Sequence, residues 1–187
     1  TGSTDKKADW KFDRLYNKAE LHIVVFDSEE ALDEFDMSKS NRVVLEFLGF
    51  EKNSVRQYVF EKQSGKWELT QLNTFGMSLH YDSEFLEFYG RFANDSAFQR
   101  KHLDDYVDFV TYDESNEEKI EGVIDVDQWY AFHPDMPYDN VLNLYYGQRL
   151  DNADVRVISV RGNSNSWSSM FKFKKKDGVW KLVKFVN

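Results

Sequence analysis

Apolar and polar residues alternate in many short runs along the chain, and this period of two predicts antiparallel β-strands with one buried face. Two turns containing glycine, at residues 64–67 (SGKW) and 177–180 (DGVW), predict hairpins. Further strands are expected at 22–27, 106–113, 119–126 and 142–147. The clearest alternating runs are VVLEFLGF (43–50), VRQYVFEK (55–62), VRVISVRG (155–162) and SSMFKFKK (168–175).

A different period occupies residues 82–103. Phe85, Phe88, Tyr89 and Phe92 recur at the spacing of one apolar helix stripe. The sequence AND (93–95) interrupts this stripe, and Ser96 followed three residues later by Gln has the spacing of a capping box. The segment therefore predicts a helix, a break and a second helix that begins at Ser96.

The alternating pattern is repeated within the chain. GKWELTQL (65–72) returns as GVWKLVKF (178–185) at an offset of 113 residues, and the strands before it match at the same offset. We interpret this as two tandem related halves, 1–76 and 77–187, with Trp67 and Trp180 both in the core. Only the second half contains the helices, so the first is expected to lack N-terminal helices that would precede Thr1.

The amino-acid composition argues against several classes of binding partner and of chemistry. The formal net charge of −9 argues against nucleic acids and anionic membranes. The chain has no cysteine, which excludes disulfides and thiolate chemistry. The four histidines lie at no metal-ligand spacing, so neither a metal nor a cofactor is expected. The basic run at Lys172–Lys176 alternates with Phe and is interpreted as the solvated face of an edge strand.

The chain resembles a known family in three segments: FLEFYGRFANDSAFQ (85–99), DKKADWKFDRLYN (5–17) and the twin G-x-W-x-L strand. They resemble the secreted Bacteroidetes family DUF4348, a domain of unknown function with the nuclear-transport-factor-2-like (cystatin-like) fold. The resemblance implies an α+β cone, in which curved antiparallel sheets carry helices on one face. It also implies a periplasmic or cell-surface location, with a secretory or lipoprotein signal outside this chain and membrane attachment only through such a lipid anchor.

Cones of this class hold small molecules between helix and sheet, and some are enzymes. The catalytic candidates are Asp125 and Asp127, spaced as a general acid and base on one strand face, and His133 in the proline-bearing loop. An enzyme that uses these residues, together with a tyrosine or histidine in the cone pocket of the second half, would carry out hydrolysis or proton abstraction. Alternatively, Asp125 and Asp127 lie on the solvent-exposed face of a strand and have no catalytic role.

A non-catalytic binding module is the first hypothesis for function. Aromatic residues cluster in the second half, and Tyr138, Tyr145 and Trp167 are the candidates for a pocket rim on which a small molecule, glycan or peptide stacks. A third hypothesis is a structural or assembly role, in which sheet faces form a homodimer or contact another partner.

Overall fold

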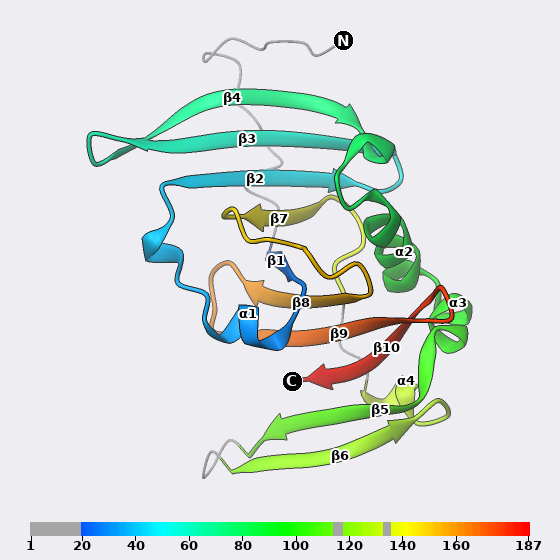
Figure 1. Ribbon diagram of the computed structural model, residues 1–187. Coiled ribbons are helices and arrows are strands. Elements are labelled where there is room, and N and C mark those ends of the chain that lie inside the picture. The colour runs from blue at the N-terminus through cyan, green and yellow to red at the C-terminus, as the bar shows by residue number, and fades with distance from the viewer. Residues whose placement is uncertain (1–19, 114–117, 133–135) are drawn as a thin grey trace.

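The computed structural model describes residues 20–113, 118–132 and 136–187, and every strand in these ranges belongs to one strongly curved ten-stranded sheet (Figure 1). The strand order is β4-β3-β2-β7-β1-β8-β9-β10-β5-β6. The strands are β1 (Leu21–Phe26), β2 (Arg42–Gly49), β3 (Ser54–Gln63), β4 (Lys66–Gly76), β5 (Leu103–Tyr112), β6 (Lys119–Asp125), β7 (Val141–Tyr145), β8 (Val155–Gly162), β9 (Ser168–Lys176) and β10 (Val179–Val186).

The helices are short and few, so the fold class is α+β. They are α1 (Glu29–Asp33), α2 (Ser83–Asn94), α3 (Ser96–Lys101) and α4 (Trp129–Phe132), with 3₁₀ turns at Met37–Lys39 and Met77–Leu79. The predicted helix, break and second helix are confirmed as α2 and α3. The capping prediction was off by one residue, because Asp95 and not Ser96 caps α3 through the Phe98 amide.

The sheet is mixed rather than wholly antiparallel. Strand β1 runs parallel to β7 and antiparallel to β8, so the first strand of the chain lies between two strands from its last third. Strand β5 runs parallel to β10, and the other neighbours are antiparallel. The two tandem halves are not confirmed as separate bodies, since strands of both form one sheet, and the boundary between 76 and 77 stays a prediction.

The sheet carries an apolar layer on each face. One face, here called the α2 face, holds the main core, in which Ile23 and Val25 of β1 lie with Phe85, Tyr89 and other rings of α2. The alternate residues Val24 and Phe26 point to the other side, called the α1 face, where Leu32 and Phe35 pack on them. Figure 1 shows α1 over β1, β8 and β9, and α2 and α3 along the other side of the sheet.

Residues related by the sequence repeat lie on opposite faces. Phe171 and Phe173 of β9 belong to the core under α2, and Tyr58 and Phe60 of β3, 113 positions earlier, belong to a separate cluster with Leu142. Leu142 neighbours Val141 along β7, and Val141 belongs to the core under α2, so the two clusters lie on opposite faces.

The face inversion explains why the prediction for Trp67 was wrong. Trp180 is 5 % exposed and lies 5.0 Å, between ring centroids, from Phe85 of α2. Trp67, its repeat counterpart, is 47 % exposed on edge strand β4. In the described part of the chain no helix lies over β4, and a ring at that position therefore faces solvent.

The interpretation of Lys172–Lys176 as an edge strand was also wrong. These residues belong to β9, which lies between β8 and β10 in the interior of the sheet. Lys172 and Lys176 point to the α1 face, where they pair with Glu29 and Asp104. The alternation was correctly read as one wet face, but the pattern alone does not distinguish an edge from an interior strand.

The two predicted hairpin turns are confirmed and nearly identical. Ser64 and Gly65 between β3 and β4 have φ of 49° and 82°, and Asp177 and Gly178 between β9 and β10 have φ of 51° and 77°. Two consecutive residues with positive φ are typical of the type I′ turn, which matches the twist of the strands it joins. Glycine is favoured at the second position of each turn, because a residue with a side chain is strained at such a positive φ.

Candidate functional site

A hollow of about 860 Å³ lies on the α1 face of the sheet, over β1, β8 and β9. Its apolar walls come from α1 and the segment after it, from β7 and from the β8–β9 loop. Phe35 contacts Phe26 and Tyr146, with ring centroids 5.2 and 5.3 Å apart, and so forms one aromatic side. Trp167 and Met170 line the hollow on the β9 side.

Polar side chains line the floor and the far end of the same hollow. Ser159 and Ser169 are each 5 % exposed, and the Arg161 Nε donates to Ser159 Oγ at 3.1 Å. Among the described residues Arg161 forms no ion pair with a carboxylate, although Asp33 at the end of α1 also lines the hollow. The hollow therefore combines aromatic walls with a cation, hydroxyls and amides, which is the usual make-up of a small-molecule site.

The loop that presents Trp167 is held by close contacts. The Gly162 amide donates to the Trp167 carbonyl at 2.9 Å, and the Trp167 amide donates to Asn165 Oδ1 at 3.1 Å. A Cβ at Gly162 would lie 1.8 Å from that same Oδ1. A larger residue at this position would therefore displace the Asn165 side chain, which supports the Trp167 amide.

The Tyr146 hydroxyl is a hydrogen-bond donor at neutral pH. Burial raises the pKa of Tyr146, and the positive charge of Arg161 lowers it by less. Because an ordinary tyrosine already has a pKa of about 10, a raised value keeps this group protonated. A ligand in the hollow would therefore meet a neutral hydroxyl at Tyr146 and a positive guanidinium at Arg161.

The three aromatic residues predicted to form a rim do not lie together. Trp167 lines the hollow on the α1 face. Tyr145 points to the α2 face, where its ring lies 5.5 Å from that of Tyr81. Tyr138 is 48 % exposed in the segment before β7. The rim candidates did not include Phe35, Tyr146 or Arg161, although Tyr146 is one of the aromatic residues that cluster in the second half. The fold brings the segment after α1, the end of β7 and strand β8 around one hollow with Trp167.

The predicted carboxylate pair lies at the end of β6, outside the hollow. The Asp125 Oδ1 accepts from the backbone amides of Asp127 and Gln128 at 2.9 Å each, which is the geometry of an Asx turn. The Asp127 carboxylate pairs with Arg100, and its side chain is 83 % exposed. His133 lies outside the described residues.

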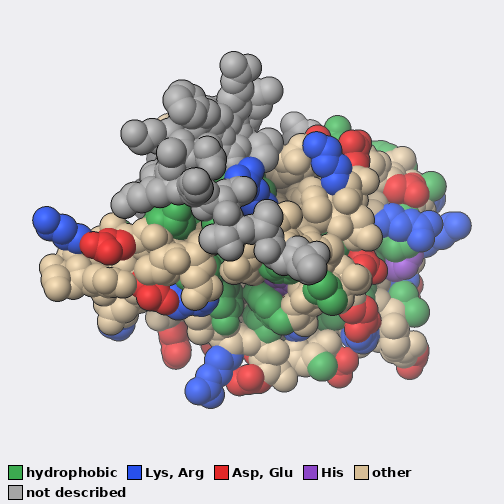
Figure 2. Space-filling model, turned by 90° about the horizontal axis from the view of Figure 1, so that it is seen from above, with side chains coloured by type: hydrophobic (Ala, Val, Ile, Leu, Met, Phe, Trp, Pro, Cys, Tyr) green, Lys and Arg blue, Asp and Glu red, His purple; other side chains and the backbone are tan. Residues whose placement is uncertain are grey.

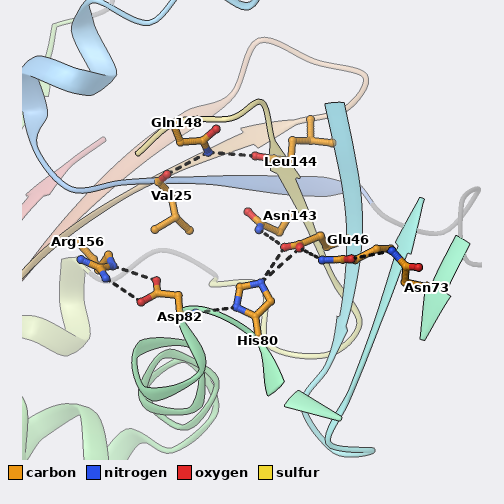
Figure 3. Close-up of polar contacts among 10 residues, drawn as sticks. Val25, Glu46, Asn73, His80, Asp82, Asn143, Leu144, Gln148 and Arg156 are labelled. Carbon is orange, nitrogen blue, oxygen red and sulfur yellow. Dashed lines mark hydrogen bonds and ion pairs between the residues drawn. The ribbon is translucent and has the colours of Figure 1, made fainter. Parts of the chain in front are cut away.

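A second polar group of residues is buried on the α2 face (Figure 3). Glu46 of β2 is fully buried and accepts hydrogen bonds from Gln57 of β3 at 2.7 Å and from Asn143 of β7 at 2.6 Å. Both donors lie directly opposite Glu46 in neighbouring strands, and Asn73 of β4 continues the row by donating to Gln57. Four neighbouring strands thus share one polar ladder across the sheet.

His80, in the turn before α2, completes the coordination of Glu46. Its Nδ1 accepts from the Asp82 amide at 3.1 Å, so its Nε2 carries the proton and donates to Glu46, with both carboxylate oxygens 3.3 Å away. The Asp82 carboxylate in turn accepts from Arg156 Nε and Nη2 at 2.9 and 2.8 Å. Arg156 also donates to the carbonyls of Asn152 and Val155.

This buried network has the residue types of an acid–base site but lacks the access. The side chains of His80 and Glu46 are 1 % and 0 % exposed, and those of Asp82 and Arg156 are each 8 % exposed. A general base must come within hydrogen-bond reach of the substrate proton. The network therefore fixes the turn before α2 onto the sheet. The one sequence signal for it was a single carboxylate inside the apolar run VVLEFLGF.

Two features are absent from the described residues. No group of three or more His, Cys, Asp or Glu side chains in these ranges could hold a metal ion. No helix within the same ranges is both long enough and apolar enough to cross a bilayer. We take the hollow on the α1 face as the candidate functional site, because it combines aromatic walls with polar groups.

A curved sheet with helices on one side is the architecture of NTF2-like proteins, and comparison with known proteins supports this class. The crystal structure of an NTF2-like protein from Bacteroides fragilis NCTC 9343 is similar, with a TM-score of 0.83 and 34 % identity, covering 98 % of this chain and 81 % of that one. The chain belongs to the family described as a domain of unknown function, DUF4348, which matches residues 1–187. No curated protein matches the chain.

Proposed function

We propose that this protein is a non-catalytic binding module that holds a small organic molecule in the hollow on the α1 face. The observation that carries the proposal is a hollow of about 860 Å³ with aromatic walls and with Arg161, a cation that forms no ion pair with a carboxylate among the described residues. Sites for drug-sized ligands usually span about 300–1,000 Å³. This size favours a single small molecule over a glycan chain or an extended peptide.

The chemistry of the lining indicates the class of ligand. Trp167, Phe35 and Tyr146 offer flat apolar surfaces, and Arg161 offers a positive charge beside them. A carboxylate on the ligand would form a charge-assisted hydrogen bond with the guanidinium. We therefore expect an amphipathic organic acid, with an apolar ring body and one carboxylate, at the periplasmic or cell-surface location that the family resemblance implies.

The opposite placement of the two repeat copies supports two related halves within one sheet. Strands β7 and β1 run side by side and parallel at the centre, and each is followed outward by an antiparallel three-stranded meander. A two-fold axis along the strands would relate the meanders and invert their faces. On this proposal the hollow lies on the α1 face because the longest helix, α2, covers the second copy on the opposite face.

Thermal unfolding of the full chain tests the binding proposal. The probes are pooled bile acids, aromatic carboxylates, neutral sugars and short peptides. The shift caused by each carboxylic acid is compared with the shift caused by its uncharged amide. A ligand at 100 times its Kd would stabilise the native state by about 2.7 kcal/mol. We expect a shift with the organic acids that disappears in Trp167→Ala and weakens with the amides or in Arg161→Gln.

Trp67→Ala is the matched control, because it removes an exposed tryptophan from β4, far along the sheet from the hollow. A shift that Trp67→Ala abolishes and Trp167→Ala retains would place the ligand elsewhere. No shift with any probe, in a protein that unfolds cooperatively, would overturn the organic-acid proposal.

A further inference from the structure

Strand β6 ends the sheet at one side, and within the described ranges it is paired with another strand on only one of its edges. It spans Lys119–Asp125, and its seven residues pair with β5 in an unbroken register without a bulge. Two of its apolar side chains are exposed, Ile120 at 49 % and Val123 at 59 %. Long, flat and partly apolar edges readily pair with another strand.

The other edge of the sheet differs in the features that prevent such pairing. Strand β4 contains a register shift between Val59 and Phe60 of its partner β3, and a bulge of this kind twists an edge away from a second chain. The part of β4 nearest the hairpin presents the polar residues Lys66, Glu68 and Thr70 beside the half-exposed Trp67. Figure 2 looks onto this end of the molecule and shows positive and negative side chains interspersed over the described surface.

The sequence of β6 is complementary to itself when reversed. In an antiparallel pair related by a two-fold axis at Gly122, Lys119 of one copy faces Asp125 of the other. Ile120 then faces Ile124, Glu121 faces Val123, and each glycine faces its own copy, where the space next to its Cα is open. The self-complementary pairs are thus the charges at the two ends of the strand and the isoleucines next to them. Two residues of opposite charge that face each other across a strand pair are favourable, and so are two β-branched residues in the same arrangement.

The two faces of β6 are consistent with this register. Ile120, Gly122 and Ile124 share the side on which Phe109 of β5 joins the core, and Lys119 and Asp125 share the other side with Tyr112 and Tyr106. The apolar pairs would extend the α2-face core across the axis, and the charge pairs would lie on the wet side. Within one copy Lys119 already pairs with Glu121, which it can keep as a neighbour.

We infer that β6 is a homodimerisation edge, at which two copies of this chain join antiparallel about Gly122 into one continuous sheet. The interaction is isologous, since the same strand serves both copies. One strand pair buries less surface than a permanent dimer requires, so the dimer is expected to be weak and concentration-dependent.

Sedimentation equilibrium of the full chain over a range of concentrations tests this inference. The wild-type protein should dimerise, and Lys119→Glu should raise the dimer dissociation constant by about tenfold, because two like-charge pairs replace two opposite-charge pairs. Asp125→Lys should weaken the dimer in the same way. An equimolar mixture of the two variants should associate again, since each copy then supplies the charge that the other lacks.

Two controls keep the test decisive. Lys66→Glu makes the same charge change on the β4 edge and should leave association unchanged. Ile120→Glu alters an exposed residue and so tests the register independently if Asp125→Lys, which loses an Asx turn, fails to fold. A monomeric wild type at all concentrations, equal effects of Lys119→Glu and Lys66→Glu, or no association in a mixture of folded variants would overturn the inference.

Discussion

His80 Nε2 lies 3.3 Å from both carboxylate oxygens of Glu46, and neither side chain is accessible to solvent. The histidine comes from the turn that leads into α2, and the glutamate comes from the middle of β2. Their contact therefore fixes the turn before α2 to strand β2. Because Glu46 also accepts from Gln57 and Asn143, it is the shared acceptor of three donors.

Replacing Glu46 by Gln should destabilise the protein although the shape of the side chain is kept. The amide has one acceptor oxygen and places an NH₂ group against side chains that already donate. A buried donor without an acceptor costs roughly 1–3 kcal/mol, and more for a charged group, so we expect a loss of about 3 kcal/mol in the free energy of unfolding. Urea denaturation measures it.

Glu68→Gln is the control for this change, because Glu68 is an exposed glutamate on β4. It should leave the urea midpoint nearly unchanged. Equal effects of the two substitutions would contradict the role given to Glu46 as a shared acceptor.

The pair Asp82–Arg156 should contribute far more to stability than the pair Asp127–Arg100, although both join the same residue types. Asp82→Asn leaves a buried guanidinium without its carboxylate, and breaking a buried pair from one side usually costs roughly 3–5 kcal/mol. Asp127→Asn breaks a pair in which the Asp side chain is 83 % exposed, and the expected change is below about 1 kcal/mol. Thermal and urea unfolding of both variants would reveal the difference. Similar losses would show that burial does not decide the strength of these pairs.

The two tryptophans of the repeat should respond differently to truncation. Trp180→Ala removes a ring that packs against Phe85 under α2, and large-to-small changes of this kind cost about 3–5 kcal/mol. Trp67→Ala removes a half-exposed ring from an edge strand and should cost less than about 1 kcal/mol. Unfolding in guanidinium measures both. A large loss in Trp67→Ala would show that this ring packs against part of the chain outside the described residues.

The contrast between these tryptophans shows how far the sequence could predict the fold. Alternation and turn chemistry are local signals, and they correctly located the strands, both hairpins and the helix stripe at Phe85. Which face of a strand is covered depends on helices distant in sequence, so the pattern around Trp67 could not indicate exposure. The NTF2-like class followed from the resemblance, and the comparison structure confirms it.

The candidate site was less predictable because its residues have no common spacing. Trp167 was proposed for a pocket rim and does line the hollow. Arg161 belongs to β8 and Tyr146 directly follows β7, and the sheet places these two strands on either side of β1, a topology that no local pattern indicates. Asp125 and Asp127 had the spacing of a catalytic pair, but the same spacing serves an Asx turn at a strand end.

Stability at acid pH should depend on Glu29, which joins α1 to the sheet. Lys172 and Lys184 both donate to its carboxylate. Burial raises the pKa of Glu29, but the hydrogen bonds and charges of the two lysines outweigh burial and hold it below its ordinary value of 4.5. The folded state therefore binds this proton less readily than the unfolded state. The stabilising contribution of Glu29 is present above pH 4.5 and is lost as the pH falls through the folded-state pKa.

The difference in unfolding free energy between wild type and Glu29→Gln should accordingly be largest near neutral pH, at about 1 kcal/mol, and should shrink toward zero in acid. Glu30→Gln is the matched control. Glu30 follows Glu29 in α1, but its side chain is exposed and forms no ion pair among the described residues. Its difference from wild type should be small at every pH. If the Glu29→Gln difference were instead constant with pH, or grew in acid, the lysines could not be the cause. Because α1 forms one wall of the hollow, the same titration followed with a bound ligand would show whether loosening α1 releases it.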